Sequence, residues 1–395
     1  MPTLLQINAT ANWGSTGRIA EQIGNAAIQA GWKSYIAFGR HNGESSSRLI
    51  RIGNNIDVYF HALMARFFDC AGLCSRHATK RFIKRLSKIK PDIVHLHNIH
   101  GYYVNYKLLF EYLSTTDIKV VWTFHDCWAF TGHCPHFINI GCYKWRTQCY
   151  SCPLKKEYPS SILFDNSKKN YSIKKNVFSK LPVHIVSVSN WMNDLVSQSF
   201  MQNNNLSIIH NGIDINVFKP ITFKERSLYR ILAVSNIWTN DKGLNDLYRL
   251  RVLLSSEYEI HIVGLTDDQI GQLPSGICGF KRTASVEELV DAYTSADVLV
   301  NPTYADTFPT VNLESLACGT PVITYNTGGS PEAIDELTGV IVEQGNVEAL
   351  AEAIINLKNN PLSSHACRER ARQLFDKDRC FDKYIELYQS LVCQK

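Results

Sequence analysis

Short apolar, β-rich runs alternate with helical patterns along the whole chain, and this alternation restricts the fold more than any other feature. Runs such as TLLQINA (residues 3–9) and YRILAVS (residues 229–235) are each followed by a segment with helical spacing of apolar residues. Such alternation is typical of parallel sheets, because each parallel strand needs a crossover connection to its neighbour. The series occurs twice, so we predict an α/β protein with two facing Rossmann-like domains.

The chain length of 395 residues agrees with two domains, since an ordinary domain holds roughly 100–200 residues. The first series has expected strands at 3–9, 33–39, 92–98, 119–126 and 184–189, and expected helices at 16–31, 59–90, 104–114 and 190–200. The second has expected strands at 229–235, 259–264, 297–303 and 321–326, and expected helices at 243–255, 286–295, 308–318 and 347–359. A polar run after Pro220 predicts the boundary, giving domains 1–220 and 221–395, with the last helix expected to cross back to the first domain.

Charge divides at the same boundary. Residues 1–220 hold 25 Lys and Arg against 12 Asp and Glu, a net charge of +13, whereas residues 221–395 hold 16 against 24, a net charge of −8. With 45% hydrophobic and 19% charged residues, the chain lies within the globular range. The basic half therefore favours a partner that carries negative charge.

No apolar run approaches the roughly 18 residues that a membrane-spanning helix needs. The N-terminal sequence MPTLLQINATANWG also lacks the basic and apolar regions of a signal peptide. We therefore expect a cytoplasmic protein.

Ligands of open α/β sheets bind at the carboxyl ends of the strands, so the loops that follow the expected strands are the candidate sites. After the first strand, Gly14 and Gly17 either bring backbone N–H groups close to an anion or only form a tight turn. The strand KVVWTF ends at His125, which could bind a ligand hydroxyl or carry a proton. A buried histidine bonded to a backbone carbonyl is the alternative, but the position favours the ligand.

Two loops of the second half have anion-binding character. Lys242 and Gly243 open an expected helix after the strand YRILAVS, and a lysine there suits a pyrophosphate, with a solvated surface lysine as the alternative. Gly328 and Gly329 follow the strand PVITYN and form a second glycine loop that an anion could approach.

The segment DTFPTVNLE, residues 306–314, is the most informative of these loops. A proline at position 309 is typical of the first helical turn, which would leave the N–H groups of Thr310 and Val311 free to bind a phosphate. Glu314, about one turn further on, could then reach a ribose diol.

Together these motifs resemble the retaining glycosyltransferases of family 4, which have the GT-B fold of two Rossmann-like domains. The matching fragments are the 14–18 loop, TFHD at 123–126, HNGID at 210–214, DKG at 241–243, the 306–314 segment followed by LACGTPV, and GGSPE at 328–332. Their order and spacing cover nearly the whole chain. The resemblance implies a UDP- or GDP-sugar donor held mainly by the C-terminal domain, an acceptor held mainly by the N-terminal domain, and no metal or other cofactor for catalysis.

The resemblance also assigns roles to residues. Glu314 resembles the carboxylate that binds the nucleotide ribose, Lys242 the pyrophosphate lysine, and His125 the histidine that contacts the donor sugar. The family signature Glu-x7-Glu begins here with Asp306, a shorter carboxylate. Family members commonly carry an arginine a few residues before the lysine, where this chain has SNIWTN, and Arg18 is a substitute by its chemistry alone. The catalytic set is His125, Lys242 and Asp306, and the donor-binding set is Gly14, Lys242, Phe308, Thr310, Val311, Glu314, Gly328 and Gly329.

The implied mechanism is electrostatic. As the bond to the diphosphate lengthens, Lys242 and the N–H groups of Thr310 and Val311 would stabilise the leaving phosphate. That phosphate would accept the proton of the incoming hydroxyl on the same face, which gives retention. The expected acceptor is a saccharide or a lipid-linked saccharide in polysaccharide biosynthesis.

A cysteine-rich insert, residues 127–153, follows His125 closely. Cys134, Cys142, Cys149 and Cys152 have the spacing C-x7-C-x6-C-x2-C, in which only the last pair is typical of zinc sites. A long irregular loop usually needs an internal cross-link, so a structural zinc on these four thiolates is one interpretation. Cys127, His133 and His136 are substitutes as ligands, and reduced buried thiols are the other interpretation.

A basic run at residues 80–90 has Phe82, Leu86 and Ile89 on one helical face and Lys84, Arg85 and Lys88 on others. Such a helix could lie on anionic lipid, which would place the protein peripherally at the inner face of the membrane. A solvated crossover helix packed on the sheet is the alternative, and we favour it slightly.

Two other functions are compatible with parts of the sequence. A nucleotide-sugar 2-epimerase shares the fold but needs no separate acceptor, and the motifs at 242–243 and 306–321 argue against it. A zinc-stapled nucleic-acid-binding protein would explain the basic half, but it leaves the crevice motifs without a role, so we expect no nucleic-acid partner.

Overall fold

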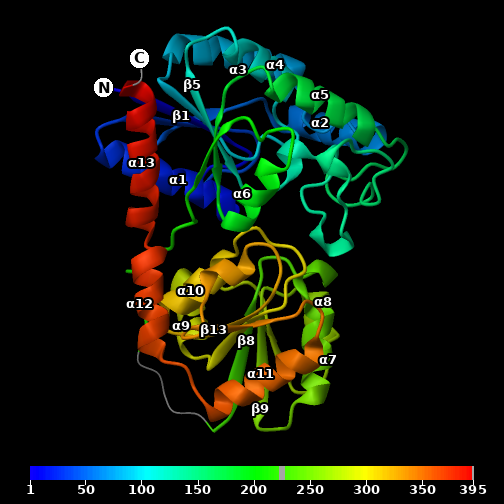
Figure 1. Ribbon diagram of the computed structural model, residues 1–395, viewed down its shortest axis with the longest axis vertical. Helices are drawn as coiled ribbons and strands as arrows, with labels where there is room; N and C mark the ends of the chain where they lie inside the picture. The colour runs from blue at the N-terminus through cyan, green and yellow to red at the C-terminus, as the bar shows by residue number, and fades with distance from the viewer. Residues whose placement is uncertain (222–226, 394–395) are drawn as a thin grey trace. The chain divides into compact units, whose positions relative to one another are not determined.

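The computed structural model describes residues 1–221 and 227–393 (Figure 1). The chain forms two compact units, residues 1–210 with 381–395, and residues 211–380. The N-terminal unit thus ends at residue 210, whereas the sequence pattern placed the boundary at 220, and the C-terminal end of the chain groups with the N-terminal unit.

The N-terminal unit is built on a seven-stranded sheet in the order β3-β2-β1-β4-β5-β6-β7, and every strand pairing is parallel. The predicted parallel sheet is therefore confirmed, with edge strands that the sequence analysis had missed. The strands are β1 (Thr3–Asn8), β2 (Lys33–Phe38), β3 (Arg48–Arg51), β4 (Ile93–Leu96), β5 (Lys119–Phe124), β6 (His184–Ser187) and β7 (Asn205–Ile208).

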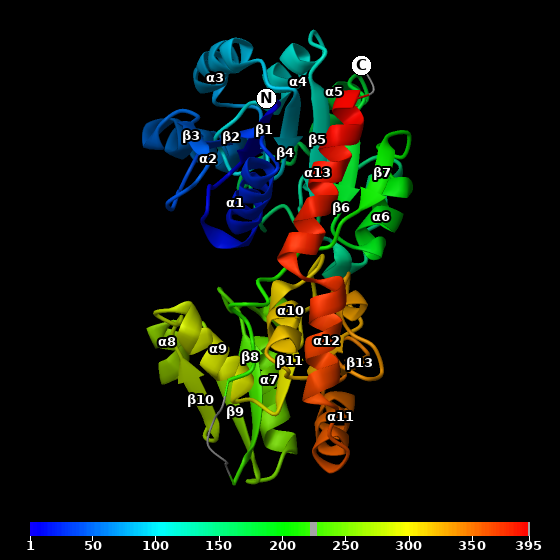
Figure 2. The same ribbon diagram turned by 90° about the vertical axis from the view of Figure 1, so that its left-hand side faces the viewer.

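Helices cover both faces of this sheet. The helices are α1 (Gly14–Gln29), α2 (Asn55–Phe68), α3 (Arg76–Ile89), α4 (Tyr106–Leu113), α5 (Ser167–Phe178), α6 (Asn190–Ser197) and α13 (Lys377–Cys393). One apolar core holds residues of α3, α4, α5 and α6. A second core holds residues of α1 and α13, which Figure 2 shows along the same side of the sheet. Three short 3-10 turns, η1 (Trp128–Phe130), η2 (Ile138–Ile140) and η3 (Lys144–Arg146), lie in the cysteine-rich insert.

The C-terminal unit has a six-stranded sheet in the order β10-β9-β8-β11-β12-β13, again with parallel pairings throughout. Its strands are β8 (Tyr229–Val234), β9 (Tyr258–Val263), β10 (Ile277–Phe280), β11 (Val298–Asn301), β12 (Val322–Tyr325) and β13 (Gly339–Val342). Its helices are α7 (Leu244–Leu253), α8 (Asp267–Gly271), α9 (Val286–Thr294), α10 (Thr310–Ala317), α11 (Val347–Asn359) and α12 (Ser364–Leu374), with 3-10 turns η4 (Asn240–Lys242) and η5 (Ser330–Ala333). The core between this sheet, α7 and α11 consists mainly of buried Leu, Ile, Val and Ala side chains, with Trp238, Tyr258 and Tyr325.

The single helix expected over residues 59–90 is wrong, because the chain forms α2 and α3 with a turn between them. Asp69 ends α2 in the left-handed conformation, at φ 46°. The turn is then held by His61, whose Nδ1 lies 2.8 Å from the Ser75 hydroxyl and whose Nε2 accepts the N–H of Gly72. In α3, Phe82 and Leu86 are buried in the sheet core, which agrees with the crossover-helix interpretation of the basic run.

None of the helices within the described residues is long and apolar enough to cross a membrane.

Candidate functional site

Three loops meet at the carboxyl edge of the second sheet, where backbone hydrogen bonds join them. The N–H of Tyr304, after β11, donates to the carbonyl of Asp241, after β8, at 2.8 Å. The N–H of Gly329, after β12, donates to the carbonyl of Asp306 at 3.3 Å. The loops that contain the predicted segments 241–243, 306–314 and 328–332 are therefore brought together.

Gly243 makes this close approach sterically feasible. It has a φ of +78°, and a Cβ atom there would lie 2.2 Å from the carbonyl oxygen of Pro302. Only glycine fits both the conformation and the space. The Lys-Gly pair thus places a lysine at the site through a turn that other residues could not make.

Lys242 and Asp306 form an ion pair at this edge. The Lys242 ammonium lies 2.8 Å from Oδ2 of Asp306 and donates a longer bond of 3.4 Å to the carbonyl of Ala305. Their side chains are 34% and 23% exposed, so both groups can still reach a ligand. The residue that departs from the family signature is therefore the one that holds the lysine.

The predicted phosphate site lies at the start of α10 (Thr310–Ala317). Pro309 is the N-cap residue, and no side chain caps the helix. As the first two residues of the helix, Thr310 and Val311 have N–H groups without an acceptor inside it. The side chain of Phe308, another predicted donor-binding residue, is buried against Phe375, and its carbonyl accepts a bond from Asn211. Its ring therefore anchors the loop.

Glu314 is held by a tyrosine that the sequence analysis did not identify. The hydroxyl of Tyr293, on α9, donates to Oε2 of Glu314 at 2.7 Å. Burial and the neighbouring carboxylate raise the pKa of Tyr293 well above its ordinary value, so the hydroxyl keeps its proton. No motif marks a tyrosine near the end of an amphipathic helix.

The two glycines after β12 have different environments. Gly328 adopts a φ of +57°, as expected for a glycine turn. The backbone N–H of Gly329 is already taken by the carbonyl of Asp306. Gly329 therefore joins two loops of the site, and its N–H is not available to an anion in this conformation.

In the N-terminal unit, Gly14 lies at the start of α1 with a φ of +67°. The preceding residue, Trp13, gives α1 no side-chain cap, and the first turn contains no acidic residue. Gly17 is packed closely, since a Cβ there would lie 2.7 Å from the Thr10 hydroxyl oxygen. Gly17 is thus explained by packing, and Gly14 and the exposed Arg18 lie at an uncapped helix N-terminus.

His125 follows β5, is half-buried, and is hydrogen-bonded to a series of buried polar side chains. Its Nε2 lies 3.0 Å from Nδ1 of His97, and Nε2 of His97 lies 3.0 Å from Oε1 of Gln6 on β1. The amide nitrogen of Gln6 donates in turn to the carbonyl of Ala20 at 2.7 Å. Burial lowers the pKa of His125 to about 4 and that of His97 well below its ordinary value, so both rings are neutral near pH 7.

This series of hydrogen bonds, from Ala20 through Gln6 and His97, determines which nitrogen of His125 carries the proton. Because the Gln6 amide nitrogen donates to Ala20, its oxygen faces His97 and must accept a proton from Nε2 of that ring. A neutral His97 then has a lone pair on Nδ1, which accepts from Nε2–H of His125. Nδ1 of His125 is thus the acceptor nitrogen, able to receive a hydrogen bond from a hydroxyl.

A second polar pair lies beside His125. Nε2 of His100 is 2.7 Å from Oδ2 of Asp126, and the other carboxylate oxygen accepts the N–H of Trp128 at 2.9 Å. Burial alone would raise the pKa of Asp126, but His100 and the Trp128 N–H lower it to about 2. No sequence motif marks His100, although its position four residues after the end of β4 is a signal that could have identified it.

The cysteine-rich insert brings its four predicted ligands to one small cavity, which Cys134, Cys142, Cys149 and Cys152 line together with His133. The N–H of Gly132 donates to Sγ of Cys149 at 3.2 Å, while His133 is bonded to Asp69 at 2.6 Å. Across residues 1–221 and 227–393, no three His, Cys, Asp or Glu side chains are arranged to hold a metal ion. The thiols are close together without forming a ligand set, and in this same part of the chain every cysteine is free.

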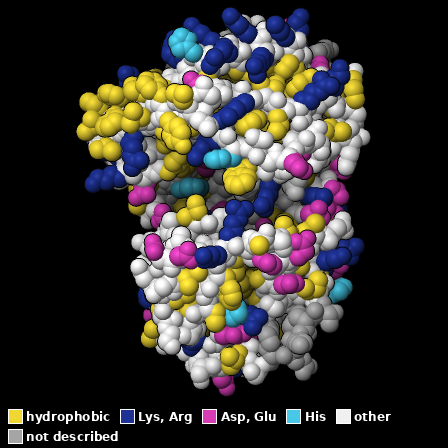
Figure 3. Space-filling model, turned by 180° about the vertical axis from the view of Figure 1, so that it is seen from behind, with side chains coloured by type: hydrophobic (Ala, Val, Ile, Leu, Met, Phe, Trp, Pro, Cys, Tyr) yellow, Lys and Arg dark blue, Asp and Glu magenta, His cyan; other side chains and the backbone are white. Residues whose placement is uncertain are grey.

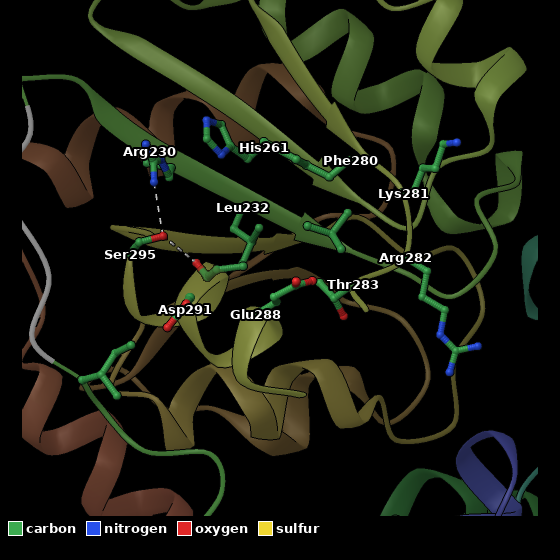
Figure 4. A pocket seen from close by; sticks show the side chains of 13 residues that line it. Arg230, Leu232, His261, Phe280, Lys281, Arg282, Thr283, Glu288, Asp291 and Ser295 are labelled. Carbon is green, nitrogen blue, oxygen red and sulfur yellow. Dashed lines mark hydrogen bonds between the residues drawn. The ribbon is translucent and has the colours of Figure 1, made fainter. Parts of the chain in front are cut away.

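The C-terminal unit also contains a cavity of about 620 Å³ along the face of β8, β9 and β10 (Figure 4). Arg230, which donates to the Ser295 hydroxyl at 3.2 Å, lines one end, and residues 281–283, after β10, line the other. Ile221, which adjoins the undescribed residues 222–226, also lines it. The predicted donor-binding residues are not part of this lining.

The geometry described above agrees with the sequence families that the chain matches. The model of the family described as Glycosyltransferase Family 4 matches residues 16–217, and the model described as Glycosyl transferases group 1 matches residues 229–360. The chain therefore belongs to glycosyltransferase family 4, as the motifs had indicated. This membership favours glycosyl transfer over the epimerase and nucleic-acid interpretations.

Known proteins are similar over the full chain. The protein of Escherichia coli K12 named as colanic acid biosynthesis glycosyl transferase WcaC is 24% identical over 98% of this chain and 100% of its own length. The structure of sucrose-phosphate synthase from Thermosynechococcus elongatus has a TM-score of 0.76 at 17% identity, covering all of both chains. That of Anabaena HepE in complex with UDP-glucose has a TM-score of 0.63 at 13% identity, covering 98% and 99%. These structures confirm the GT-B fold.

Proposed function

We propose that this glycosyltransferase moves a sugar, with retention of configuration, from a UDP- or GDP-sugar to a hydroxyl of a saccharide or lipid-linked saccharide in polysaccharide biosynthesis. The observation that carries the proposal is the Lys242–Asp306 pair beside the uncapped first turn of α10. The colanic acid relative supports the pathway class, and the UDP-glucose complex of HepE supports the donor class.

Lys242 and the first turn of α10 would stabilise the leaving group. The C1–O bond to the diphosphate breaks, and the negative charge that develops on its oxygen is met by the ammonium and by the N–H groups of Thr310 and Val311. The acceptor oxygen forms the new bond to C1 on the same face. Its proton passes to the departing phosphate oxygen, so no protein base and no metal ion is required.

Asp306 acts mainly through Lys242 in this proposal. Its carboxylate lies 2.8 Å from the ammonium and so fixes where the positive charge is placed. In the family signature a longer Glu occupies this position, and the shorter side chain here keeps its oxygen on the lysine. Asp306 would thus position the lysine first and contact the sugar hydroxyls second.

Glu314 and His125 would bind hydroxyl groups. The Tyr293 hydroxyl fixes one carboxylate oxygen of Glu314, which orients the carboxylate to accept bonds from a ribose diol. Nδ1 of His125 would accept a bond from a hydroxyl of the donor sugar. Both groups accept hydrogen bonds, which suits a ligand rich in hydroxyl donors.

A panel of UDP- and GDP-sugars tests the proposal. We expect one donor to raise the thermal midpoint of the purified protein and to be hydrolysed slowly without acceptor, because water replaces the acceptor hydroxyl. NMR of the released sugar, recorded before mutarotation, should show the anomeric configuration of the donor. An inverted product would refute retention, and release of an epimerised sugar would refute transfer.

The cysteine cluster keeps structural zinc as a separate proposal. The four thiols line one cavity, and the N–H of Gly132 already donates to one sulfur, as backbone groups do around thiolate ligands. Zinc would supply a cross-link for the long insert and no step of the reaction. Metal analysis of the purified protein should give about one zinc per chain, and less than about a tenth of an equivalent would refute it.

A further inference from the structure

Helix α2 leaves most of its apolar side chains in water. Only His61 and Ala65 of its 14 residues are buried. Ile56, Tyr59, Phe60 and Leu63 are 52–78% exposed, and Phe67 follows on the same side. Their spacing of three or four residues places them on one stripe of the helix. In most soluble proteins such a stripe faces the core, so an exposed one indicates a partner.

A second segment enlarges this stripe. Ile162, Leu163 and Phe164 are 51–60% exposed. The N–H of Ile162 donates to the carbonyl of Arg66 at 2.7 Å, and the rings of Phe164 and Phe68 stack with centroids 5.7 Å apart. We call the exposed apolar residues of α2, with Phe68 and residues 162–164, the α2 apolar surface. It is formed by segments about a hundred residues apart.

The helix that carries this surface is firmly built. Asn54 and Asp57 form a reciprocal capping box at its start, and Asp69 ends it in the left-handed conformation. Asp69 also accepts bonds from His133 and from the N–H of Asn166, which tie α2 to the insert and to the start of α5. The exposed side chains therefore belong to an ordered, anchored helix.

The neighbouring helix α3 is strongly basic. It contains six Lys and Arg residues and no Asp or Glu, and Arg81 reaches Asp57 of α2 at 3.7 Å. The other basic side chains of α3 are exposed, as is Arg66 of α2. Figure 3 shows Lys and Arg side chains around the hydrophobic patch on the N-terminal unit. An apolar stripe bordered by cations matches the chemistry of an anionic lipid surface.

We propose that the α2 apolar surface inserts into the interfacial region of an anionic membrane, with α3 contacting the lipid head groups. A second copy of this chain is disfavoured as the occupant, because pairing this face with itself would bring two clusters of like charge together. The inference rests on the proposed function, because membrane binding would bring the enzyme to a lipid-linked acceptor. The α2 apolar surface is not the membrane surface that the sequence suggested. That surface was the apolar face of residues 80–90, whose Phe82 and Leu86 are buried.

Sedimentation with vesicles tests this inference without any transferase activity. We expect the full chain to bind vesicles containing about one third phosphatidylglycerol at least ten times more tightly than pure phosphatidylcholine, and less tightly at high salt. The variant Tyr59→Gln/Phe60→Gln/Leu63→Gln should bind the anionic vesicles at least tenfold more weakly than the wild type. Glutamine keeps the helix propensity, and the changed side chains are exposed, so the fold is preserved.

The matched control removes exposed apolar side chains elsewhere. Val252→Gln/Leu253→Gln/Leu337→Gln changes three exposed residues of the C-terminal unit and should leave vesicle binding unchanged. Replacing Lys84, Arg85 and Lys88 by Gln should weaken binding to the anionic vesicles at least tenfold.

Equal vesicle binding by the α2 variant and the wild type would overturn the inference. So would concentration-dependent dimerisation that the α2 variant abolishes, if the wild type binds no vesicles. Donor-induced thermal stabilisation, measured on the same α2 variant, separates the two proposals. If stabilisation persists while vesicle binding is lost, the membrane surface is supported independently of the donor site.

Discussion

The candidate site residues of the two units differ in how their polar groups are held. In the C-terminal unit the groups are charged and partly exposed, as with Lys242 and Asp306. In the N-terminal unit His97 and His125 are neutral, and a buried chain that begins at Gln6 fixes their protons. The difference shows that the C-terminal unit keeps its candidate charged groups on loops near water, whereas the N-terminal unit orients neutral side chains in a largely buried network.

The physical reason is the cost of burial. A charged group that must bind a diphosphate has to keep part of its hydration until the ligand replaces it, so it lies on a loop. A neutral imidazole loses little on burial and gains a fixed orientation. The comparison can therefore be tested by variants that remove a charge in the C-terminal unit and by variants that remove a hydrogen bond of the histidine network in the N-terminal unit.

Removing the charge of Lys242 should have the largest effect. Lys242→Ala is expected to lower kcat by two to three orders of magnitude, because the leaving phosphate loses its main counter-charge. Steady-state kinetics with the preferred donor measures this, and circular dichroism checks the fold. Lys358→Ala is the matched control, since Lys358 is 31% exposed and pairs with Glu257 at 2.7 Å away from the site loops. Near-normal turnover of Lys242→Ala would remove the proposed role.

Low pH should destabilise the N-terminal unit. His125 has a pKa of about 4 when folded and an ordinary value of 6.5 when unfolded. Between those pH values only the unfolded chain binds the proton, so the free energy of unfolding falls with decreasing pH by about 1.4 kcal/mol per pH unit for this group. Above pH 6.5 both states are neutral and the effect vanishes.

Denaturant unfolding of the N-terminal unit at pH 7, 6 and 5 measures this slope, and His125→Gln should reduce it, by up to about 1.4 kcal/mol per pH unit between pH 6 and 5 and by less between pH 7 and 6. His77→Gln, which changes an exposed histidine of α3, should leave it unaltered. An unchanged slope in His125→Gln would show that the ring is not held neutral.

Disturbing the order of the network should have an intermediate effect. Nitrogen chemical shifts of the full chain should show His125 protonated at Nε2, and Gln6→Leu should produce a mixture of tautomers and lower kcat about tenfold. Gln22→Leu, on the neighbouring helix α1, serves as the control. A wild-type His125 protonated at Nδ1 would contradict the assignment.

The smallest effect is expected at Tyr293. Tyr293→Phe removes the bond that orients Glu314 but leaves the carboxylate, so KM for the donor should rise up to about tenfold while kcat changes little. Tyr248→Phe, at a half-buried tyrosine of α7 in the same unit, should behave like the wild type. A large fall in kcat with unchanged KM would assign the tyrosine to the chemical step instead.

Local patterns predicted the strands at the centre of each sheet and the helices between them. Helix α11 begins and ends at the predicted residues, Val347 and Asn359. Edge strands such as β3 and β7 were missed because they are short and carry polar residues. The break between α2 and α3 was missed because it depends on His61 bonding to Ser75, a contact that no periodicity reveals.

The sequence by itself determined the chemistry of the candidate site: a lysine before a glycine turn, a carboxylate after a proline-led helix, and a histidine after a strand. The tertiary structure alone decided how these groups are held. His95 bonds to Tyr388 and Thr123 to Tyr384, both on the last helix of the chain. The tertiary structure also decided that the apolar stripe of α2 stays exposed, whereas that of α3 is buried. The reason is that spacing is a local property, whereas burial and hydrogen bonding depend on partners that are distant in sequence.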